Sequence, residues 1–182
     1  MKKMMFNDKY GLTKAVLEER KTMTRRIVNE SFIDEGQTLP KYEIGEIVAI
    51  AQSYENAGLI PHSLVPKVDG SIIAASNHKG WNNKMFVKPE LMPHQIRITN
   101  VRIERLQDIS DKDCLAEGIE FDGKAQTFYC GMNFSNNAKI WLGRTPREAY
   151  AALIDKVGKK GDWASNPYVF VYEFELIKKS KG

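Results

Sequence analysis

The last strand-like segment of the chain constrains the fold most, because it is long and clearly two-sided. Residues 168–177 read YVFVYEFELI, with a large apolar side chain at every second position: Tyr168, Phe170, Tyr172, Phe174 and Leu176. Side chains alternate between the two faces of a β-strand, so this pattern predicts a long strand with one apolar face. Residues 95–106, QIRITNVRIERL, predict a second long strand. Ile96 and Ile98 alternate along it, and so do Val101 and Ile103, but the two pairs are out of phase by one residue. A β-bulge near residues 99–100 would bring both pairs to a common face.

Helices and strands do not alternate regularly along the chain. Residues 12–20 have apolar side chains at helical spacing, and Ser110 and Thr145 have the sequence context of helix N-caps. Strands are predicted at residues 21–28 and 46–52. This order favours an α+β or barrel-like fold over a parallel βαβ sheet. The sequence contains no GxGxxG or Walker A motif, so it lacks the fingerprints of the nucleotide-binding folds.

Two stretches rich in Gly, Pro, Asn and Ser are predicted to be irregular insertions, at about residues 53–90 and 121–150. Short strands are expected within the first of them, at residues 71–75 and 85–87. Loops of this length are uncommon inside a compact domain and are often functional. The length of 182 residues suits one domain. We therefore expect a single domain over residues 1–182 that carries both insertions.

The composition is that of an ordinary globular protein, with 42% hydrophobic and 27% charged residues. No stretch approaches the roughly 20 apolar residues of a membrane helix, and the start of the chain does not resemble a signal peptide. We therefore expect a cytoplasmic protein with no membrane contact. The net charge of +4 gives some support to a polyanionic partner. Cys114 and Cys130 form no CxxC pair and the histidines lack metal-binding spacing, so we expect two free thiols, no metal and no cofactor.

The most informative segment is the basic junction, residues 17–26, which connects the first predicted helix to the next strand and reads LEERKTMTRR. Within seven residues it holds four cations and two hydroxyls: Arg20, Lys21, Arg25, Arg26, Thr22 and Thr24. A solvated turn followed by an exposed strand face would have the same composition. If the junction instead binds nucleic acid, we expect Lys21 and Arg26 to dominate a salt-dependent affinity.

The junction resembles the signature of the ASCH family, relatives of the PUA RNA-binding barrel. Arg20–Arg26 matches the RKTxTxR form of that signature, and Glu19 departs from it, since the family usually has glycine there. Tyr42–Val48, Leu106–Ile119 and Val169–Leu176 resemble further ASCH segments in the same order. The resemblance implies a small, mixed, PUA-like β-barrel with flanking helices, and a role directed at RNA or nucleosides. Residues 81–87 and the two insertions resemble the longer ASCH proteins of phages and gut bacteria.

One branch of the ASCH family hydrolyses the acetyl amide of acetylcytidine. Its catalytic lysine, threonine and glutamate correspond by position to Lys21, Thr24 and Glu117. The resemblance implies that Thr24 is the nucleophile, that neutral Lys21 takes its proton, and that Glu117 donates a proton or orients the lysine. Residues 21 and 24 point to opposite faces of a regular strand, so they can cooperate only if Lys21 lies in the turn before it.

The sequence leaves two classes of function open. The first is an amidohydrolase of an acylated nucleoside, and the second is a non-catalytic RNA-binding module. A ribonuclease is a minor third possibility, since some ASCH relatives cut RNA. Either role could use further binding residues, for which the candidates are Arg20, Thr22, Arg25, Arg26, Gln52, Tyr54 and Trp81. The partner expected in every case is RNA or a modified nucleoside.

Overall fold

The structure is a computed structural model that describes residues 1–28, 39–133 and 138–177. The chain divides into two compact units. Unit 1 comprises residues 1–6, 47–96 and 177–182, and unit 2 comprises residues 7–46 and 97–176. The prediction that residues 1–182 form one domain stays a prediction, and the two units are described separately.

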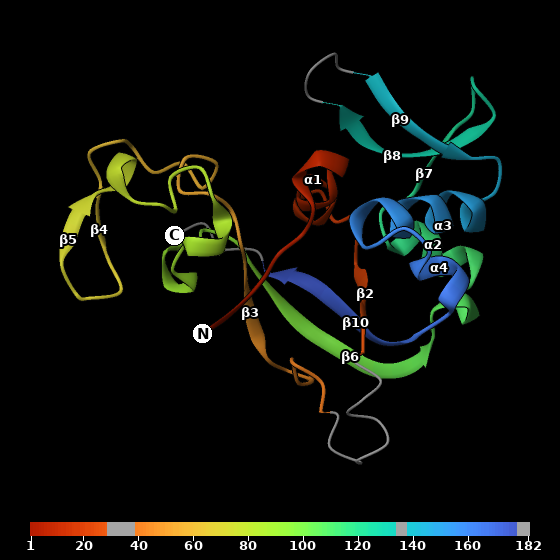
Figure 1. Ribbon diagram of the computed structural model, residues 1–182, viewed down its shortest axis with the longest axis horizontal. Helices are drawn as coiled ribbons and strands as arrows, with labels where there is room; N and C mark the ends of the chain where they lie inside the picture. Colours follow the sequence, from red (N-terminus) through yellow and green to blue (C-terminus); the bar gives the residue numbers. More distant parts are fainter. Residues whose placement is uncertain (29–38, 134–137, 178–182) are drawn as a thin grey trace. The chain divides into compact units, whose positions relative to one another are not determined.

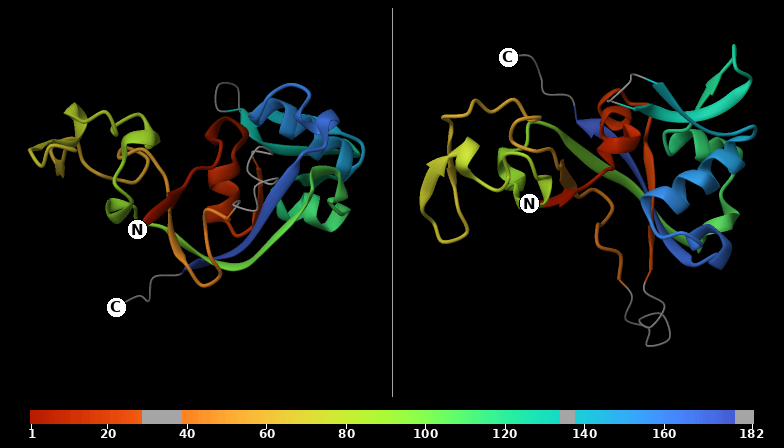
Figure 2. Two further views of the ribbon diagram at one scale, coloured as in Figure 1. Left: turned by 60° about the horizontal axis from the view of Figure 1, so that its bottom comes forward. Right: turned by 45° about the horizontal axis from the view of Figure 1, so that its top comes forward.

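The sheet of unit 2 contains the two long strands that the sequence predicts. Its strands, in order of neighbours, are β6 (Gln95–Arg105), β10 (Tyr168–Ile177) and β2 (Met23–Ile27). Figure 2 shows β6 and β10 running side by side. β10 and β2 are antiparallel, with Val171 opposite Arg25 and Tyr172 opposite Thr24. Both predicted long strands are therefore confirmed, and β2 begins two residues later than predicted.

The two apolar pairs of β6 differ in exposure. Ile96 and Ile98 are fully buried, whereas Ile103 is 50% exposed. Val101 and Ile103 line a surface hollow. The β-bulge that the sequence predicts near residues 99–100 stays a prediction.

Residues 121–150 are not irregular, which corrects the prediction for this insertion. They form a three-stranded antiparallel sheet followed by a helix, with strands β7 (Glu120–Asp122), β8 (Thr127–Asn133) and β9 (Ala138–Gly143). The pairing of β8 with β9 shifts register at two places. Such shifts break the alternation of side chains by which strands are recognised in a sequence. The α+β class is confirmed, while the closed barrel stays a prediction: among the described strands, no pairing closes a sheet on itself.

Helices and single turns of 3-10 helix complete unit 2. They are η1 (Asp8–Tyr10), α1 (Leu12–Leu17), η6 (Leu106–Asp108), α2 (Asp111–Ala116), α3 (Pro146–Val157) and α4 (Asp162–Ser165). Both predicted N-caps are confirmed, since Ser110 accepts from Asp113 N and Thr145 accepts from Glu148 N. In Figure 1, α2, α3 and α4 gather together, and α3 contacts α2, α4 and β9. Of the helices in the described ranges, none is both long and apolar enough to cross a membrane.

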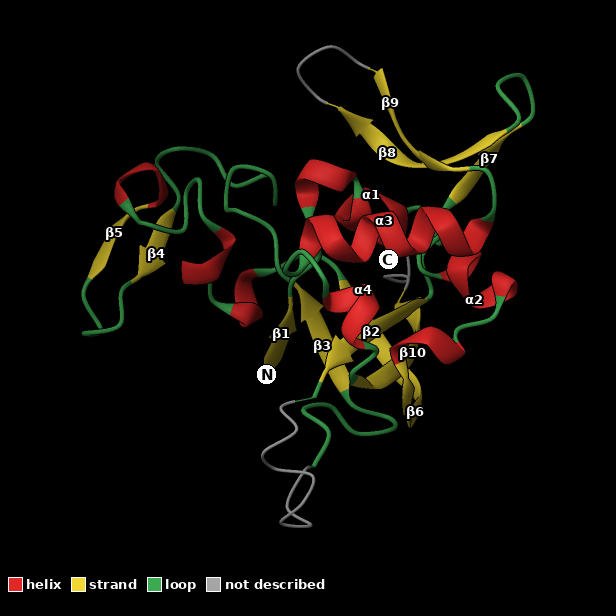
Figure 3. Cartoon of the chain, turned by 45° about the vertical axis from the view of Figure 1, so that its right-hand side comes forward, coloured by secondary structure: helices red, strands yellow, loops and turns green. Residues whose placement is uncertain are grey.

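Unit 1 is built from short elements around a small core. β1 (Lys2–Met4) lies parallel to β3 (Ile47–Ile50), and β4 (Leu64–Pro66) lies antiparallel to β5 (Ile72–Ala74). Three single turns of 3-10 helix follow, η3 (Ala75–Asn77), η4 (Lys84–Phe86) and η5 (Pro89–Leu91) (Figure 3). The predicted strand at residues 71–75 is confirmed as β5. The one at residues 85–87 is wrong, because Asn83 caps a helical turn there by accepting from Met85 N.

In the turn after helix α1, one residue combines a left-handed backbone with a side chain. Glu19 has φ 60 and stands where the ASCH signature usually has glycine. The amides of Arg20 and Lys21 then both donate to the carbonyl of Ala15, at 2.9 and 3.0 Å. This turn places Lys21 before β2, which begins at Met23. Lys21 therefore lies in the turn before the strand, which is where the sequence analysis requires it to be if it is to cooperate with Thr24.

We expect Glu19→Gly to be more stable than Glu19→Ala by about 1 kcal/mol. Both variants remove the same carboxylate, and only glycine relieves the cost of a Cβ in the left-handed region. Urea unfolding of the two variants measures the difference. Glu18, with φ −92, is the matched control, and there the alanine variant should be the more stable of the two. A Glu19→Ala variant at least as stable as Glu19→Gly would contradict this explanation of the turn.

Candidate functional site

The basic junction and the end of α2 meet in a buried ion pair. The Lys21 ammonium donates to Glu117 Oε2 at 2.5 Å and to the Glu117 carbonyl at 2.9 Å. Lys21 is 2% exposed and Glu117 is 4% exposed. Gly118, with φ 99, ends α2 so closely against the junction that a Cβ on it would lie 3.5 Å from Lys21 Cβ. The local geometry of both chain segments thus brings together two of the three predicted catalytic residues.

A second buried cation shares the same carboxylate. Arg25 Nη1 donates to Glu117 Oε1 at 3.2 Å, and the Arg25 side chain has no exposed surface. Its other nitrogens bind Glu104 at 2.7 Å and Asp113 at 2.8 Å. Arg102, on β6, also pairs with Glu104 and Asp113. Arg102 also pairs with Glu173 of β10. Among the described residues, three cations and four carboxylates of unit 2 are therefore linked in one network.

The surroundings of Glu117 shift the protonation of its neighbours. Burial lowers the pKa of Lys21, against the attraction of Glu117, and the charges of Arg26 and Arg25 lower that pKa further. The Tyr150 hydroxyl donates to Glu117 Oε1 at 3.5 Å. Burial, followed by the charge of Glu117, raises the pKa of Tyr150 well above its ordinary value. Tyr150 is thus a neutral donor beside the carboxylate, and Lys21 is shifted toward its neutral form.

Thr24 lies on the other face of β2 from Arg25. Successive strand residues point to opposite faces, so Thr24 shares its face with Arg26 and with their partners on β10, Tyr172 and Phe170. Thr24 is 5% exposed. Its hydroxyl donates no hydrogen bond within the part of the chain that the structure describes. The structure therefore joins Lys21 to Glu117 but does not join Thr24 to either of them.

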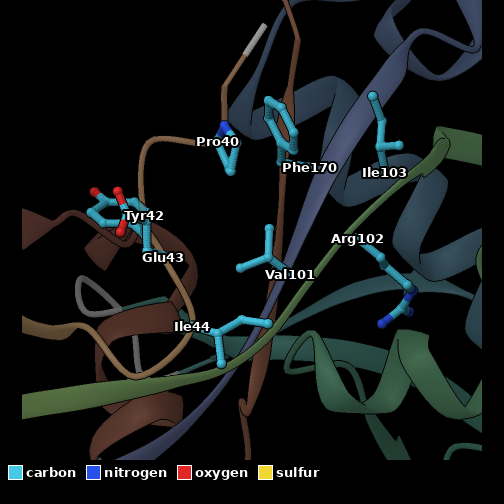
Figure 4. Close-up of a pocket in the computed structure, with 8 residues that line it drawn as sticks. All are labelled: Pro40, Tyr42, Glu43, Ile44, Val101, Arg102, Ile103 and Phe170. Atoms are coloured by element: carbon cyan, nitrogen blue, oxygen red, sulfur yellow. The ribbon is translucent and has the colours of Figure 1, made fainter.

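The face of the sheet that carries Thr24 is hollowed. The hollow has a volume of about 640 Å³. Its lining residues come from the loop that precedes β3 and from the strands β6 and β10 (Figure 4). Its lining residues are Pro40, Tyr42, Glu43, Ile44, Val101, Arg102, Ile103 and Phe170. Phe170 stands opposite Arg26 in the β10–β2 ladder. The hollow thus presents the half-buried ring of Phe170 beside the strand on which Thr24 lies, whereas Tyr42 is 4% exposed.

The remaining predicted residues of the junction differ in exposure. Arg20 pairs with Glu18 and Glu120 at 2.6 and 2.7 Å. Thr22 and Arg26 are exposed. Of the cations named as the main nucleic-acid contacts, Arg26 is therefore accessible, whereas Lys21 is enclosed by Glu117.

Gln52, Tyr54 and Trp81 belong to unit 1, whereas the basic junction belongs to unit 2. Tyr54 is fully buried in the core of unit 1, and Trp81 packs against that core. Gln52 is 8% exposed, and its side-chain oxygen is buried with no hydrogen-bond partner among the described residues. Tyr54 thus has a packing role in unit 1.

Sequence reasoning missed the partners of the junction, which are Arg102, Glu104, Asp113 and Tyr150. The spacing of Asp113 and Glu117, four residues apart on α2, was a usable signal that two carboxylates face the same neighbour. Nothing local in the sequence marks Tyr150 as a partner of Glu117. Across the described ranges, no three His, Cys, Asp or Glu side chains are arranged to hold a metal ion.

Comparison with known proteins gives two similar solved structures. No family model matches the sequence, and no curated protein matches it. A DUF984 protein from Enterococcus faecalis is 14% identical with a TM-score of 0.43, over 91% of this chain and 66% of its own length. An ASCH domain from Lactobacillus crispatus is 11% identical with a TM-score of 0.43, over 94% of this chain and 75% of its own. The second is a member of the family that the sequence motifs resemble. This chain spans less than two thirds of the DUF984 protein.

We expect Glu117→Gln to cost more stability than Lys21→Met, because two buried cations share this carboxylate. Removing its charge leaves Lys21 without an anionic partner, and breaking a buried pair in this way costs about 3–5 kcal/mol. Lys21→Met leaves Glu117 paired with Arg25, so we expect a smaller loss. Urea unfolding measures both. The exposed pair of Lys14 and Glu18 is the control, where the same substitutions should cost at most about 1 kcal/mol. The opposite order at residues 21 and 117 would contradict the shared-carboxylate account.

The lowered pKa of Lys21 also predicts a pH dependence of stability. The unfolded chain keeps this proton up to the ordinary value of 10.5, whereas the folded chain releases it at lower pH. Between the two pKa values the unfolded state binds more protons, so the contribution of Lys21 to stability rises with pH. The unfolding free energy of wild type relative to Lys21→Met should therefore increase from neutral pH toward pH about 10. A difference that stays constant or falls would show that burial does not lower this pKa.

Proposed function

We propose that this chain is an amidohydrolase that removes the acyl group of a modified nucleoside such as acetylcytidine. The observation that carries the proposal is the buried pair of Lys21 and Glu117. A lysine acts as a base only when neutral, and burial shifts Lys21 in that direction. The residue types at positions 21, 24 and 117 also agree with the ASCH pattern. The same resemblance supports the further proposal that residues 1–182 form one PUA-like barrel domain.

In the proposed reaction, the Thr24 hydroxyl attacks the acyl carbon of the substrate and its proton passes to the neutral amine of Lys21. The C–N bond then breaks, and the proton is delivered to the amino group that leaves with the base. Water hydrolyses the acyl ester on Thr24, which releases a carboxylic acid and restores the hydroxyl. Glu117 exchanges a proton with Lys21 across their hydrogen bond, so the pair returns to its starting state.

The hollow on the Thr24 face is the proposed place for the nucleoside. The half-buried Phe170 offers an aromatic surface against which a base can stack. Thr24 and Lys21 share no hydrogen bond within the described chain, so the reaction requires substrate binding to bring them together. Catalytic hydrogen bonds are often long or absent before substrate binds and tighten in the complex.

Deacylation of acetylcytidine and related acylated nucleosides, followed by chromatography, tests the proposal. We expect Lys21→Ala, Thr24→Val and Glu117→Gln each to lower kcat about a thousandfold or more, because residues that act as a unit fail together. Thr24→Val keeps the shape of the side chain and deletes only the hydroxyl. Thr99→Val, at an exposed position of β6, and Lys14→Ala, at an exposed position of α1, are the matched controls. Both controls should keep wild-type rates.

Three outcomes would reject parts of the proposal. Absence of turnover by wild type on every acylated nucleoside would reject the amidohydrolase. A fully active Thr24→Val variant would reject Thr24 as the nucleophile. A folded Lys21→Ala variant with the wild-type rate would assign the buried pair to stability alone. Cleavage of unmodified RNA by the same preparation would favour a ribonuclease instead.

Non-catalytic RNA binding through the junction has less support, because Lys21 and Arg25 are buried against carboxylates of the same chain. Arg26 is exposed beside the aromatic hollow. If the junction binds RNA, Arg26→Ala should weaken the affinity. It should also reduce the salt slope, which is the slope of log affinity against log salt concentration, by about 0.7, the value for one phosphate on a single strand. Lys21→Ala should change the slope little. An equal effect of both variants would contradict this assignment of the accessible cation.

A further inference from the structure

Unit 1 contains a second hollow that the proposed reaction does not use. It has a volume of about 810 Å³ and is formed by three segments, residues 66–69, 77–79 and 85–89, with Ile73 of β5. Ligand sites in proteins commonly have volumes of about 300–1,000 Å³. The hollow lies wholly in unit 1, within the stretch that the sequence predicts to be an insertion.

Three lysines line this hollow. Lys67, Lys79 and Lys88 come from three different segments of the wall. Within the described residues, none of the three ammonium groups makes an ion pair, in contrast to Lys21 and Arg25 in unit 2. The lining includes one acid, Asp69, whose carboxylate accepts from the amide and hydroxyl of Ser71 at 2.9 and 2.6 Å. The hollow therefore has a net positive charge and suits an anion.

His78 lies among these cations. Its Nδ1 accepts from the amide of Gly80 at 2.8 Å, so in the neutral ring the proton is on Nε2. Burial, and then the charges of Lys88 and Lys67, lower the pKa of His78. His78 thus adds a neutral N–H donor to the lining of the hollow.

An aromatic ring stands at the same site. Phe86 is 49% exposed and Met85 is 62% exposed, so the wall offers apolar surface to solvent as well as charge. The Lys79 ammonium lies 5.7 Å from the centre of the Phe86 ring. A combination of lysines with an exposed aromatic ring is how proteins bind single-stranded nucleic acid, with cations on the phosphates and a base stacked on the ring.

Hydrogen bonds to Lys3 and Tyr54 hold one segment of the wall in place. The Lys3 ammonium donates to the carbonyls of Met85 and Val87, both at 2.7 Å, which fixes the backbone on either side of Phe86. The amide of Lys88 donates to the hydroxyl of the fully buried Tyr54 at 3.1 Å. The backbone that carries Phe86 and Lys88 is therefore positioned before any ligand arrives, which reduces the cost of binding.

We propose that the hollow of unit 1 binds a nucleoside phosphate, with the phosphate among Lys67, Lys79 and Lys88 and the base against Phe86. The ligand chemistry is the same for a free nucleotide and for one residue of a single-stranded RNA. This site does not depend on the proposed deacylation, since neither its residues nor its ligand require an acyl group.

The test is the binding of a short, fluorescently labelled single-stranded oligoribonucleotide, unacylated, across a salt series. The triple variant Lys67→Gln, Lys79→Gln, Lys88→Gln should weaken binding at least about tenfold and lower the slope of log affinity against log salt concentration by about 0.7, the value for one phosphate on a single strand. The control triple variant is Lys112→Gln, Lys124→Gln, Lys160→Gln, which removes the same charge from exposed positions of unit 2. It should change affinity by less than about threefold. Equal losses in both triple variants would overturn the site.

The ring is tested separately. Phe86→Leu should weaken binding about tenfold with an unchanged salt slope, because it removes stacking and no charge. Phe121→Leu, at a phenylalanine of β7 that is 51% exposed, is the matched control and should bind as wild type does. A Phe86→Leu variant that binds as wild type does would overturn the proposed place of the base.

Competition distinguishes the two sources of the ligand. Displacement of the labelled strand by adenosine or cytidine monophosphate, weakened in the lysine triple variant, would identify a nucleotide site. Displacement by unlabelled oligoribonucleotide alone would identify a site for an RNA strand. Inorganic phosphate that competes as well as the monophosphates would overturn the proposal, because the nucleoside would then contribute nothing.

Discussion

The carboxylate of Glu117 is the interaction on which the geometry of unit 2 depends. It receives Lys21 from the turn after α1 and Arg25 from β2, and it lies beside Tyr150 of α3. A buried charge without a partner is costly, so these three segments must keep their positions for the carboxylate to be satisfied. The same arrangement that holds the segments together lowers the pKa of Lys21, which links the stability of this region to its proposed chemistry.

Much of the fold could be predicted because it depends on short segments of sequence. The caps at Ser110 and Thr145 and the long strand over residues 168–177 depend on local patterns, and each is found where the sequence predicts it. The single apolar face predicted for that strand is wrong, because Val169 and Val171 on its other face are fully buried. The strands between residues 120 and 143 could not be recognised, because their register shifts are set by the pairing partner. The pairing of Lys21 with Glu117 followed from the family resemblance and not from spacing, since 96 residues separate the two.

The two units use their cations differently. In unit 2, Lys21, Arg25 and Arg102 are engaged by carboxylates from β6 and α2, so most of their charge is neutralised inside the protein. In unit 1, the lysines of the hollow face solvent beside an aromatic ring. The basic segment that stands out in the sequence is thus mainly internal, whereas the cations available to an anion are scattered through residues 67–88. Contacts with Lys3 and Tyr54 hold the backbone from Met85 to Lys88, and no sequence pattern reveals them.

The central claim is that burial beside Glu117 makes Lys21 a base at lower pH than an ordinary lysine. A pH titration of the Lys21 amine by NMR, with isotope-labelled lysine and the signal assigned through Lys21→Met, measures this directly. The account predicts a pKa below the ordinary 10.5 in wild type, and a lower one still in Glu117→Gln, because the carboxylate opposes the effect of burial. A wild-type pKa at or above 10.5 would contradict the account.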